Sequence, residues 1–550
     1  MLRNRAFVSV VMLLALVVLA TLCIGVAGFS AAAMRRVKSD RDEAITVQAA
    51  QGGLELTVAR AFSDLAANKG VLKSKEYNLT DVLGPIATGC TASSTIQPQS
   101  DTSYAWVTST VTYSTFTKSF RTLIHARNVS IWNNAIFAGA GASGQSINGN
   151  VDIRGSVHML GDGEPYTDAA GIGAYFAGDT FTDTNGNGVW DPGEPYADLL
   201  GVGHYVGPDP YNDLNGNGVY DPPLTQTSLD DTMSGAAYIG NNYYGIPSSL
   251  SSVIPAAPKV NGVETLGTEV RAKHGQISIN GSATIGASSP VNAGADKATV
   301  DGMYVNDGYT GNQGSAHVYS DNGTTNGYDV GNLGITYPVI YGVGAPVYTD
   351  TGGGSWTTQD TYLQTKSLVC PKLTITSTTT AFAYGPDLNG NLITFTPAGS
   401  HGIPAALLTI TGIVKFAGDL QIGSKDSITF AGNGTLYSTG NINIDGDFTP
   451  ASGLVFPTTT TVGFISRKNI NLATGNGSSQ LTLCGAFYAQ GKIVSAKQNK
   501  IAGTFVGDYY DMGNNVPSIY QVPSLVNNMP PAMPGDKGFY MLKVQTWRER

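Results

Sequence analysis

The chain opens with an uncharged run that constrains the rest of the molecule more than any other feature. From Ala6 to Met34, 29 consecutive residues carry no charge and are mostly apolar. Cations flank this run on both sides, at Arg3, Arg5, Arg35, Arg36 and Lys38. A hydrocarbon core of about 30 Å needs roughly 20 residues of helix to cross it. The sequence therefore predicts a transmembrane helix over about residues 6–34, with the remaining chain on one side of a membrane.

The predicted helix continues past the apolar run. Leu54, Val58, Phe62 and Leu65 recur at the spacing of a helix with one apolar stripe. A helix from near residue 6 to residue 68 would be about 90 Å long at a rise of 1.5 Å per residue. A rod that is apolar first and amphipathic afterwards favours sideways packing against similar rods.

Three interpretations of residues 1–69 compete. A cleaved secretory signal would end at the small residues Ala31–Ala33, but its apolar region should span only about 7–15 residues. A plain membrane anchor is the second interpretation. The third is a helix that leaves the membrane and packs against similar helices in an assembly.

The third interpretation rests on a resemblance. The stretch MLRNRAFVSVVMLLALVVLA, with the later patch Ala49-Ala50-Gln51-Gly52-Gly53-Leu54-Glu55, resembles the N-terminal segment of PilX-type minor pilins of type IV pilus systems. The resemblance covers about 65 residues. It implies a bacterial protein with a single pass in the inner membrane before assembly, then a place at the cell surface or in a pilus. It also implies that the N-terminal helix packs against other pilin-like subunits.

The chain departs from the pilin pattern at the processing site. Prepilins of this kind carry glycine before the cut and glutamate five residues after it, whereas this chain has Arg5-Ala6 and Val11 there. The departure argues against a major, self-polymerising subunit.

Composition points to many strands and tight turns. Glycine accounts for 69 of 550 residues, and charged residues are only 13%. The net charge is −9 and no basic stretch runs through the exposed part, so nucleic acid is excluded as an expected partner. Four cysteines are too few for a disulfide scaffold, and a single Cys370–Cys484 bridge is one pairing among those the sequence allows.

An acidic repeat occupies residues 162–231. This stretch holds thirteen Asp and Glu, and no Lys or Arg occurs between Arg154 and Lys259. A 15-residue unit recurs within it, opening D-x-x-G-x-G-x-aromatic at Asp168, Asp183, Asp198 and Asp213. So much negative charge in a short stretch favours compensation by a cation.

The second unit fits a calcium loop. Calcium takes six to eight oxygen ligands around a sharp turn, and every position of D-x-[DN]-x-[DN]-G-x₅-E is filled in this unit. The expected ligands are Asp183, Asn185, Asn187, Val189 through its carbonyl, Asp191 and Glu194. Because Pro192-Gly193 would break a following helix, the loop is similar to the helix-free calcium loops of secreted bacterial repeats.

The fourth unit fits the same pattern less completely. Its expected ligands are Asp213, Asn215, Asn217, Val219 and Asp221, but Leu224 stands at position 12. Weaker binding, or a carboxylate borrowed from Asp230 or Asp231, are the open alternatives. The first and third units have apolar residues at positions 3 and 5 and cannot bind in this way. A plain hairpin turn is the competing interpretation of each Asn-Gly-Asn-Gly.

The remaining exposed chain is predicted to be mainly β. Short apolar–polar alternations that begin after glycine recur between residues 409 and 506, as in GIVKF, GDLQI, GTLYS and GNINI. Such recurrence indicates a solenoid of stacked turns and is similar to right-handed parallel β-helices. A β-sandwich with long insertions is the alternative fold.

These patterns divide the chain into expected regions along its length. They are the pilin-like helix 1–69, a linker 70–103, a first β region 104–161, the calcium-loop insertion 162–240, a β region with loop insertions 241–400, the solenoid 401–510, and an extended tail with a last strand 511–550.

The sequence does not predict an enzyme. The chain lacks H-E-x-x-H, G-x-S-x-G and the P-loop lysine motif. Many β-helices cleave polysaccharides with groove carboxylates, and Asp419, Asp426, Asp445 and Asp447 are the candidates in this chain. Their glycine-flanked positions fit turns better than a catalytic groove.

The sequence thus predicts a calcium-stabilised minor pilin-like subunit, adhesive and placed at a tip. One alternative is a membrane-anchored domain that binds a glycan or other surface. Another is an anchored polysaccharide lyase or hydrolase.

Overall fold

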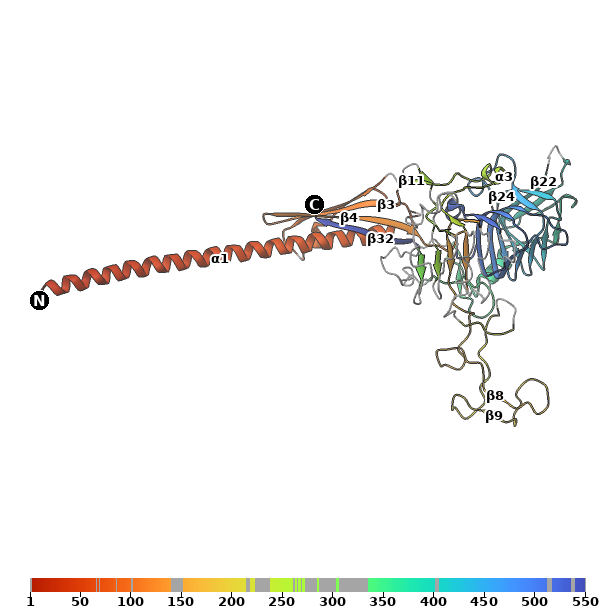
Figure 1. Ribbon diagram of the computed structural model, residues 1–550, viewed down its shortest axis with the longest axis horizontal. Helices are drawn as coiled ribbons and strands as arrows, with labels where there is room; N and C mark the ends of the chain where they lie inside the picture. The colour runs from red at the N-terminus through yellow and green to blue at the C-terminus, as the bar shows by residue number, and fades with distance from the viewer. Residues whose placement is uncertain are drawn as a thin grey trace. The chain divides into compact units, whose positions relative to one another are not determined.

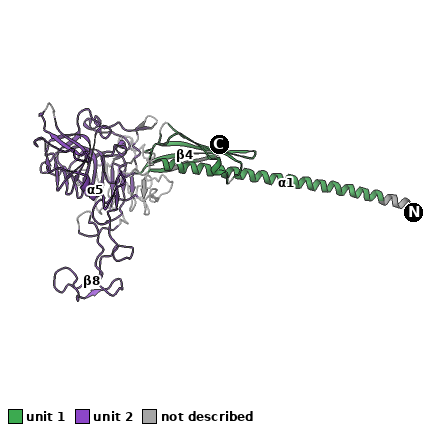
Figure 2. Ribbon diagram, turned by 180° about the vertical axis from the view of Figure 1, so that it is seen from behind, with its two compact units in different colours: residues 1–129, 538–550 green, residues 130–537 purple. Residues whose placement is uncertain are grey.

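The computed structural model divides into two compact units, residues 1–129 with 538–550 and residues 130–537 (Figure 2). It describes residues 2–65, 67–68, 70–85, 87–99, 102–139, 152–213, 218–222, 238–260, 263–264, 266–268, 270–272, 284–285, 303–305, 335–400, 405–511, 517–535 and 540–549. We call the first compact part unit 1 and the second unit 2.

Unit 1 is one long helix laid against an antiparallel sheet. Its elements are α1 (Leu2–Leu65), β1 (Lys75–Asn78), α2 (Thr80–Leu83), β2 (Thr91–Pro98), β3 (Tyr104–Tyr113), β4 (Phe116–Asn128) and β32 (Tyr540–Glu549). The five strands pair in the order β1-β2-β3-β4-β32. Every pair is antiparallel.

The second half of α1 packs on this sheet through one face. Ala50, Leu54 and Leu65 are buried on the helix, in a cluster that includes Val107 and Ile124 of the sheet. The predicted stripe is therefore present at Leu54 and Leu65, and Val58 packs partly buried against the same cluster. Phe62 departs from it, with 47% of its side chain exposed.

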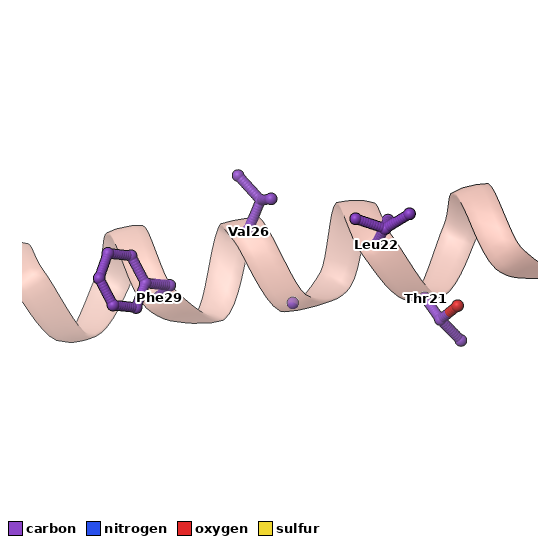
Figure 3. A pocket seen from close by; sticks show the side chains of 5 residues that line it. Thr21, Leu22, Val26 and Phe29 are labelled. Carbon is purple, nitrogen blue, oxygen red and sulfur yellow. The ribbon is translucent and has the colours of Figure 1, made fainter.

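The first half of α1 makes no such contact (Figure 1). Its apolar side chains are open, with Leu13, Leu22 and Phe29 at 66%, 60% and 78% exposure. In the described part of the chain, α1 is the one helix long and apolar enough to cross a membrane. A shallow pocket lined by Thr21, Leu22, Gly25, Val26 and Phe29 lies open on its side (Figure 3).

Unit 2 is inserted into the sheet of unit 1. β4 ends at Asn128 and β32 begins at Tyr540, and these two residues are paired partners. The chain therefore leaves unit 1 and returns to it at one point of one strand pair. This differs from two expected regions. The segment 70–103, expected as a linker, holds β1, α2 and β2, and the last strand of the expected region 511–550 completes the sheet of unit 1.

The first part of unit 2 has short elements. They are β5 (Ile136–Ala138), β6 (Asp152–Arg154), β7 (Val157–Met159), β8 (Thr180–Phe181), β9 (Tyr196–Ala197), β10 (Tyr238–Gly240), α3 (Ser248–Ser251), β11 (Lys259–Val260), β12 (Val263–Glu264), β13 (Val270–Ala272), β14 (Thr284–Ile285), β15 (Met303–Val305), β16 (Tyr348–Thr349), β17 (Ser355–Trp356) and α5 (Gln359–Lys366).

The second part of unit 2 has longer strands. Its elements are β18 (Leu368–Val369), β19 (Thr374–Ile375), β20 (Phe382–Tyr384), β21 (Leu392–Thr396), β22 (Ala406–Phe416), β23 (Leu420–Ile422), β24 (Ser427–Ser438), β25 (Ile442–Ile444), β26 (Asp447–Pro450), β27 (Thr461–Ser466), β28 (Ile470–Leu472), β29 (Thr482–Ser495), β30 (Lys500–Asp511), β31 (Ser518–Tyr520) and the 3₁₀ helix η7 (Pro523–Asn527).

Parallel pairing links these strands into one large sheet. Leu436 pairs with Phe464, Phe464 with Phe487, and Phe487 with Phe505. The phenylalanine rings pack inside: Phe464 stacks on Phe487 with centroids 4.9 Å apart, and Phe487 meets Phe505 edge to face with centroids 5.1 Å apart. The prediction of a mainly β protein with a long N-terminal apolar helix is confirmed.

The stacking order does not follow the chain order. β30 pairs with β5 through Phe505 and Ile136, so the last strands of unit 2 lie beside its first strands. β5 then pairs with β7, β7 with β13, and β13 with β15. At the other end, β20 and β21 form an antiparallel hairpin on β22. Such a hairpin covers an edge that could otherwise pair with another chain.

The close approach of α1 to its sheet predicts opposite effects for two adjacent glycines. A Cβ on Gly53 would lie 2.5 Å from Ser109 Oγ, whereas a Cβ on Gly52 would meet no atom within 4 Å. Gly53→Ala should therefore destabilise unit 1 by about 1–3 kcal/mol through overpacking. Gly52→Ala should stabilise it by up to about 1 kcal/mol through helix propensity.

Denaturant unfolding of the full chain in detergent micelles measures both effects. Adding Ser109→Ala to Gly53→Ala removes the clashing oxygen and should restore most of the lost stability. Equal effects of the two glycine changes would contradict this packing.

Candidate functional site

The acidic repeat folds into four equivalent turns. In each turn the opening aspartate accepts a hydrogen bond from the backbone N–H of the glycine five residues later. The donor–acceptor distances are 2.8 Å for Asp168–Gly173, 2.7 Å for Asp183–Gly188, 2.7 Å for Asp198–Gly203 and 2.8 Å for Asp213–Gly218. The four glycines have φ of 77, 78, 77 and 77°, a left-handed conformation that favours glycine. The repeat in the sequence is thus a repeat in the structure.

The second unit brings its predicted ligands together. Asn185 Nδ2 and Asn187 Nδ2 both donate to Asp191 Oδ2, at 2.6 and 2.7 Å. Glu194 accepts from the backbone N–H of Thr184 at 2.7 Å and of Asp191 at 3.0 Å. Asp183 accepts from the backbone N–H of Gly186 and Gly188. Carboxylate and amide groups therefore converge on one turn, where rotation of an amide exchanges its nitrogen for its oxygen.

The fourth unit is closed by a residue that the sequence pattern left unassigned. Glu164 Oε2 accepts from the backbone N–H of Asp221 at 3.2 Å, and the Glu164 N–H donates to the Asp221 carbonyl at 2.9 Å. Glu194 makes the same pair of bonds with Asp191, at 3.0 and 3.0 Å. Glu164 thus closes the loop that begins at Asp213 in the same way as Glu194 closes the loop of the second unit.

Some predicted residues of the fourth unit are not described. Asn215, Asn217, Leu224, Asp230 and Asp231 lie outside the described residues. Val219 and Asp221 are described, and Tyr509 donates to Asp221 Oδ2 at 3.0 Å. A signal for Glu164 was present in the sequence, because Gly163–Tyr166 repeats Gly193–Tyr196 thirty residues earlier.

The first and third units exchange aspartates. Asp179 accepts from the backbone N–H of Leu199 and Val206 in the third unit, at 2.9 and 2.8 Å. Asp209 closes the first unit through Ala169 and Phe176, at 2.8 and 2.9 Å. The apolar units receive aspartate and the asparagine-bearing units receive glutamate.

Aromatic rings stack the second unit on the third and the first on the fourth. Trp190 of the second unit stacks on Tyr205 of the third, with ring centroids 4.5 Å apart. Tyr175 of the first unit stacks on Tyr220 of the fourth, with centroids 3.8 Å apart. β8 and β9 pair on either side of the second loop, and a Tyr166–Tyr211 bridge joins the start of the insertion to the end of the third unit. By its ring stacking the insertion is two copies of one two-turn module, each with one asparagine-bearing loop.

The oxygens that the loops offer to a cation come from asparagine amides and backbone carbonyls as well as from carboxylates. Within the described residues, no three His, Cys, Asp or Glu side chains gather as a metal centre. Such a ligand set suits a hard cation, because calcium accepts carbonyl and amide oxygens beside carboxylates. A softer metal such as zinc would prefer nitrogen or sulfur ligands.

The candidate catalytic carboxylates of the large sheet are engaged in turns. Each of the four accepts a backbone N–H, with Asp419 bonded to Asn441 at 2.8 Å, Asp426 to Ser424 at 2.6 Å, Asp445 to Gly475 at 2.8 Å and Asp447 to Thr482 at 2.7 Å. These bonds fix the corners between strands. All four cysteines are free, so the Cys370–Cys484 bridge is wrong. Cys370 and Cys484 are buried and pack as small apolar residues.

The fold is similar to that of a solved pilin. The crystal structure of the competence-associated pilin ComZ from Thermus thermophilus matches with a TM-score of 0.52 over 92% of this chain and 97% of that chain. The sequences are 17% identical, so the likeness concerns the fold alone. No protein-family model matches the sequence, and the search of curated proteins gives no match. The chain thus has a type IV pilin-like fold.

The turn carboxylates predict sensitivity to acid. The N–H groups of Gly173, Gly188 and Gly203 lower the pKa of Asp168, Asp183 and Asp198 below the usual value. An acid with a lowered folded-state pKa stabilises the turn above its unfolded pKa of about 3.9, and this stabilisation disappears as pH falls through the lower folded value.

Amide exchange of the three glycines, scaled for intrinsic rate, should therefore stay slow from pH 7 to about 5 and accelerate below about pH 4. Full protection of these amides at pH 2 would contradict the proposed role of the carboxylates.

Proposed function

We propose that this chain is a minor pilin-like subunit of a type IV pilus or a related assembly. The observation that carries the proposal is the two-part helix α1. Its second half is buried on the sheet of unit 1, while Leu13, Leu22 and Phe29 of its first half stay exposed. An apolar half-helix needs a lipid or protein partner, because water solvates it poorly. A membrane before assembly and neighbouring pilin helices afterwards supply such partners in turn.

The finer assignment is a PilX-type, non-enzymatic subunit that ends a filament. Unit 2 is far larger than the sheet that carries it, so successive copies would crowd one another along a shaft. Arg5-Ala6 and Val11 replace the residues of the usual processing site, which also disfavours repeated self-addition. A terminal subunit places unit 2 outward, where adhesion to a glycan or another surface is its proposed role.

Unit 2 is proposed to be a right-handed parallel β-helix-like solenoid. Three columns of parallel pairing support this architecture. Residue pairs of the three columns are Thr429–Thr449, Leu436–Phe464 and Asn443–Asn471. Such stacking makes a stiff body whose core is a single column of side chains, which suits a projecting structural domain.

Calcium is the proposed cofactor of the insertion. Six residues of the second unit, from Asp183 to Glu194, supply one set of ligands. Asp213, Val219 and Asp221 supply a second set together with Asn215 and Asn217, and Glu164 adds the carboxylate missing at position 12. Extracellular calcium modules typically bind at about 10⁻⁴–10⁻³ M, which suits a protein exposed outside the cell.

The assembly proposal predicts where the protein is found. Filaments sheared from cells should carry this chain at their ends, visible by immunogold labelling of unit 2. A matched label on the major subunit should mark the whole shaft. Gold along entire filaments would contradict the terminal role. Retention of the chain in the membrane fraction, with none in sheared filaments, would instead support the plain membrane anchor.

The calcium proposal predicts that substituting either glutamate weakens one calcium site and leaves the other intact. Titration calorimetry of the full chain should count two calcium ions. Glu194→Gln and Glu164→Gln should each weaken one site by at least about tenfold, because each removes a charged ligand. The matched controls Asp179→Asn and Asp209→Asn change acids of the apolar turns and should leave both sites in place.

Terbium separates the two loops in the same experiment. Trp190 lies inside the second unit, so tryptophan-sensitised terbium emission reports that loop. Glu194→Gln should reduce this emission and Glu164→Gln should spare it. No calcium heat in the wild-type chain would refute the cofactor.

A further inference from the structure

One end of unit 1 carries a concentration of positive charge in an otherwise acidic chain. Arg35, Arg36, Lys38 and Arg41 follow the apolar run on α1, and all four are exposed. The chain as a whole has a net charge of −9. Of the acids beside these cations, Asp40 is exposed, Asp42 is 9% exposed, and Glu43 is paired with Lys118. The exposed charge just beyond the apolar run is therefore strongly positive.

The β3–β4 turn returns to the same level as these cations. Lys118 Nζ lies 2.8 Å from Glu43 Oε1, which fixes the start of β4 beside residue 43 of the helix. The far end of the strand pair lies near Gly70, where an added Cβ would be 2.5 Å from the ring of Tyr540. β4 thus runs along α1 away from its apolar half, and the turn before it points back toward that half (Figure 1).

Simple distances place the turn beside these cations. Ser109 of β3 lies against Gly53 of α1, because an added Cβ on Gly53 would be 2.5 Å from Ser109 Oγ. Five residues lead from Ser109 to Ser114, about 16 Å at 3.3 Å per residue, which equals about eleven helical residues at 1.5 Å each. Ser114 and Thr115 therefore lie near the level of Asp42, next to Arg41.

β3 and β4 add cations and no acids at this end. No Asp or Glu occurs from Thr102 to Val151, a stretch that includes all of β3 and β4. The neighbouring strand β32 places Glu549 opposite Phe120 and Arg548 opposite Arg121. Arg121 lies over the ring of Trp106 at 4.1 Å.

We propose that this end of unit 1 rests on the anionic lipid headgroups of the membrane that holds α1. The headgroup contact consists of Arg35, Arg36, Lys38 and Arg41 with the Ser114–Thr115 turn. Cations next to an anionic bilayer each strengthen the contact by about fivefold, and the attraction decays within about 10 Å at moderate salt. The contact orients the sheet against the membrane before the subunit leaves it. This inference rests on the proposed membrane insertion of α1.

The test compares two lipid compositions. The full-length protein is reconstituted in nanodiscs of phosphatidylcholine alone or of phosphatidylcholine with phosphatidylglycerol, and amide exchange of residues 113–118 is followed. Exchange should slow several-fold in the anionic discs only, and 0.5 M salt should remove the difference. The triple variant R36Q/K38Q/R41Q should lose the effect.

A matched triple variant controls for total charge. R60Q/K73Q/K75Q removes three cations, of which Arg60 lies about 29 Å beyond Arg41 along the helix, outside the reach of headgroup charge. It should behave as the wild type. Thermal unfolding of both variants in detergent checks that unit 1 stays folded.

Two results would overturn the inference. One is equal exchange in both lipid compositions, which is the outcome expected if these cations bind an acidic protein partner instead. The other is an equal loss with the distal triple variant. Failure of the chain to float with vesicles of either composition would refute the membrane insertion itself, and so separates the two proposals.

Discussion

The pairing of β32 with β4 is the interaction on which the remaining architecture depends. Tyr540 lies opposite Asn128, so the chain re-enters its first sheet at the point where it left. Because both ends of unit 2 are held at one strand pair, the sheet of unit 1 can keep its helix while carrying a body several times its size. Entry and exit also meet within unit 2, where Phe505 pairs with Ile136.

Hydrogen bonds to carboxylates fix the turns of the large sheet and of the acidic insertion. Aspartates fix the corners of the large sheet, and aspartates and glutamates close the four turns of the insertion. Each carboxylate offers several acceptor sites and can therefore bond backbone N–H groups in segments too short for a ladder. Acids also join distant parts of the insertion, since Glu164 and Asp221 come from its two ends.

The helical or strand character of most segments can be predicted from the local pattern of apolar and polar residues. The uncharged run from Ala6 to Met34 predicts a helix, because a membrane-spanning helix buries so many consecutive apolar residues. The alternation of apolar and polar residues over 409–506, interrupted by glycines, predicts strands. The candidate ligands of the second unit can be recognised in the sequence because they lie within twelve residues. Phe62 was misplaced, since periodicity does not reveal how closely a sheet approaches.

The sequence by itself thus determined the membrane-length helix, the β character of the body and the first candidate ion loop, because each is a property of adjacent residues. Tertiary structure alone decided that the last strand belongs to the first sheet, that the stacking order of unit 2 departs from chain order, and that Glu164 closes a loop beginning at Asp213. These are contacts between distant segments, selected by packing and backbone hydrogen bonding over the whole chain, and no local pattern records which partner a segment will meet.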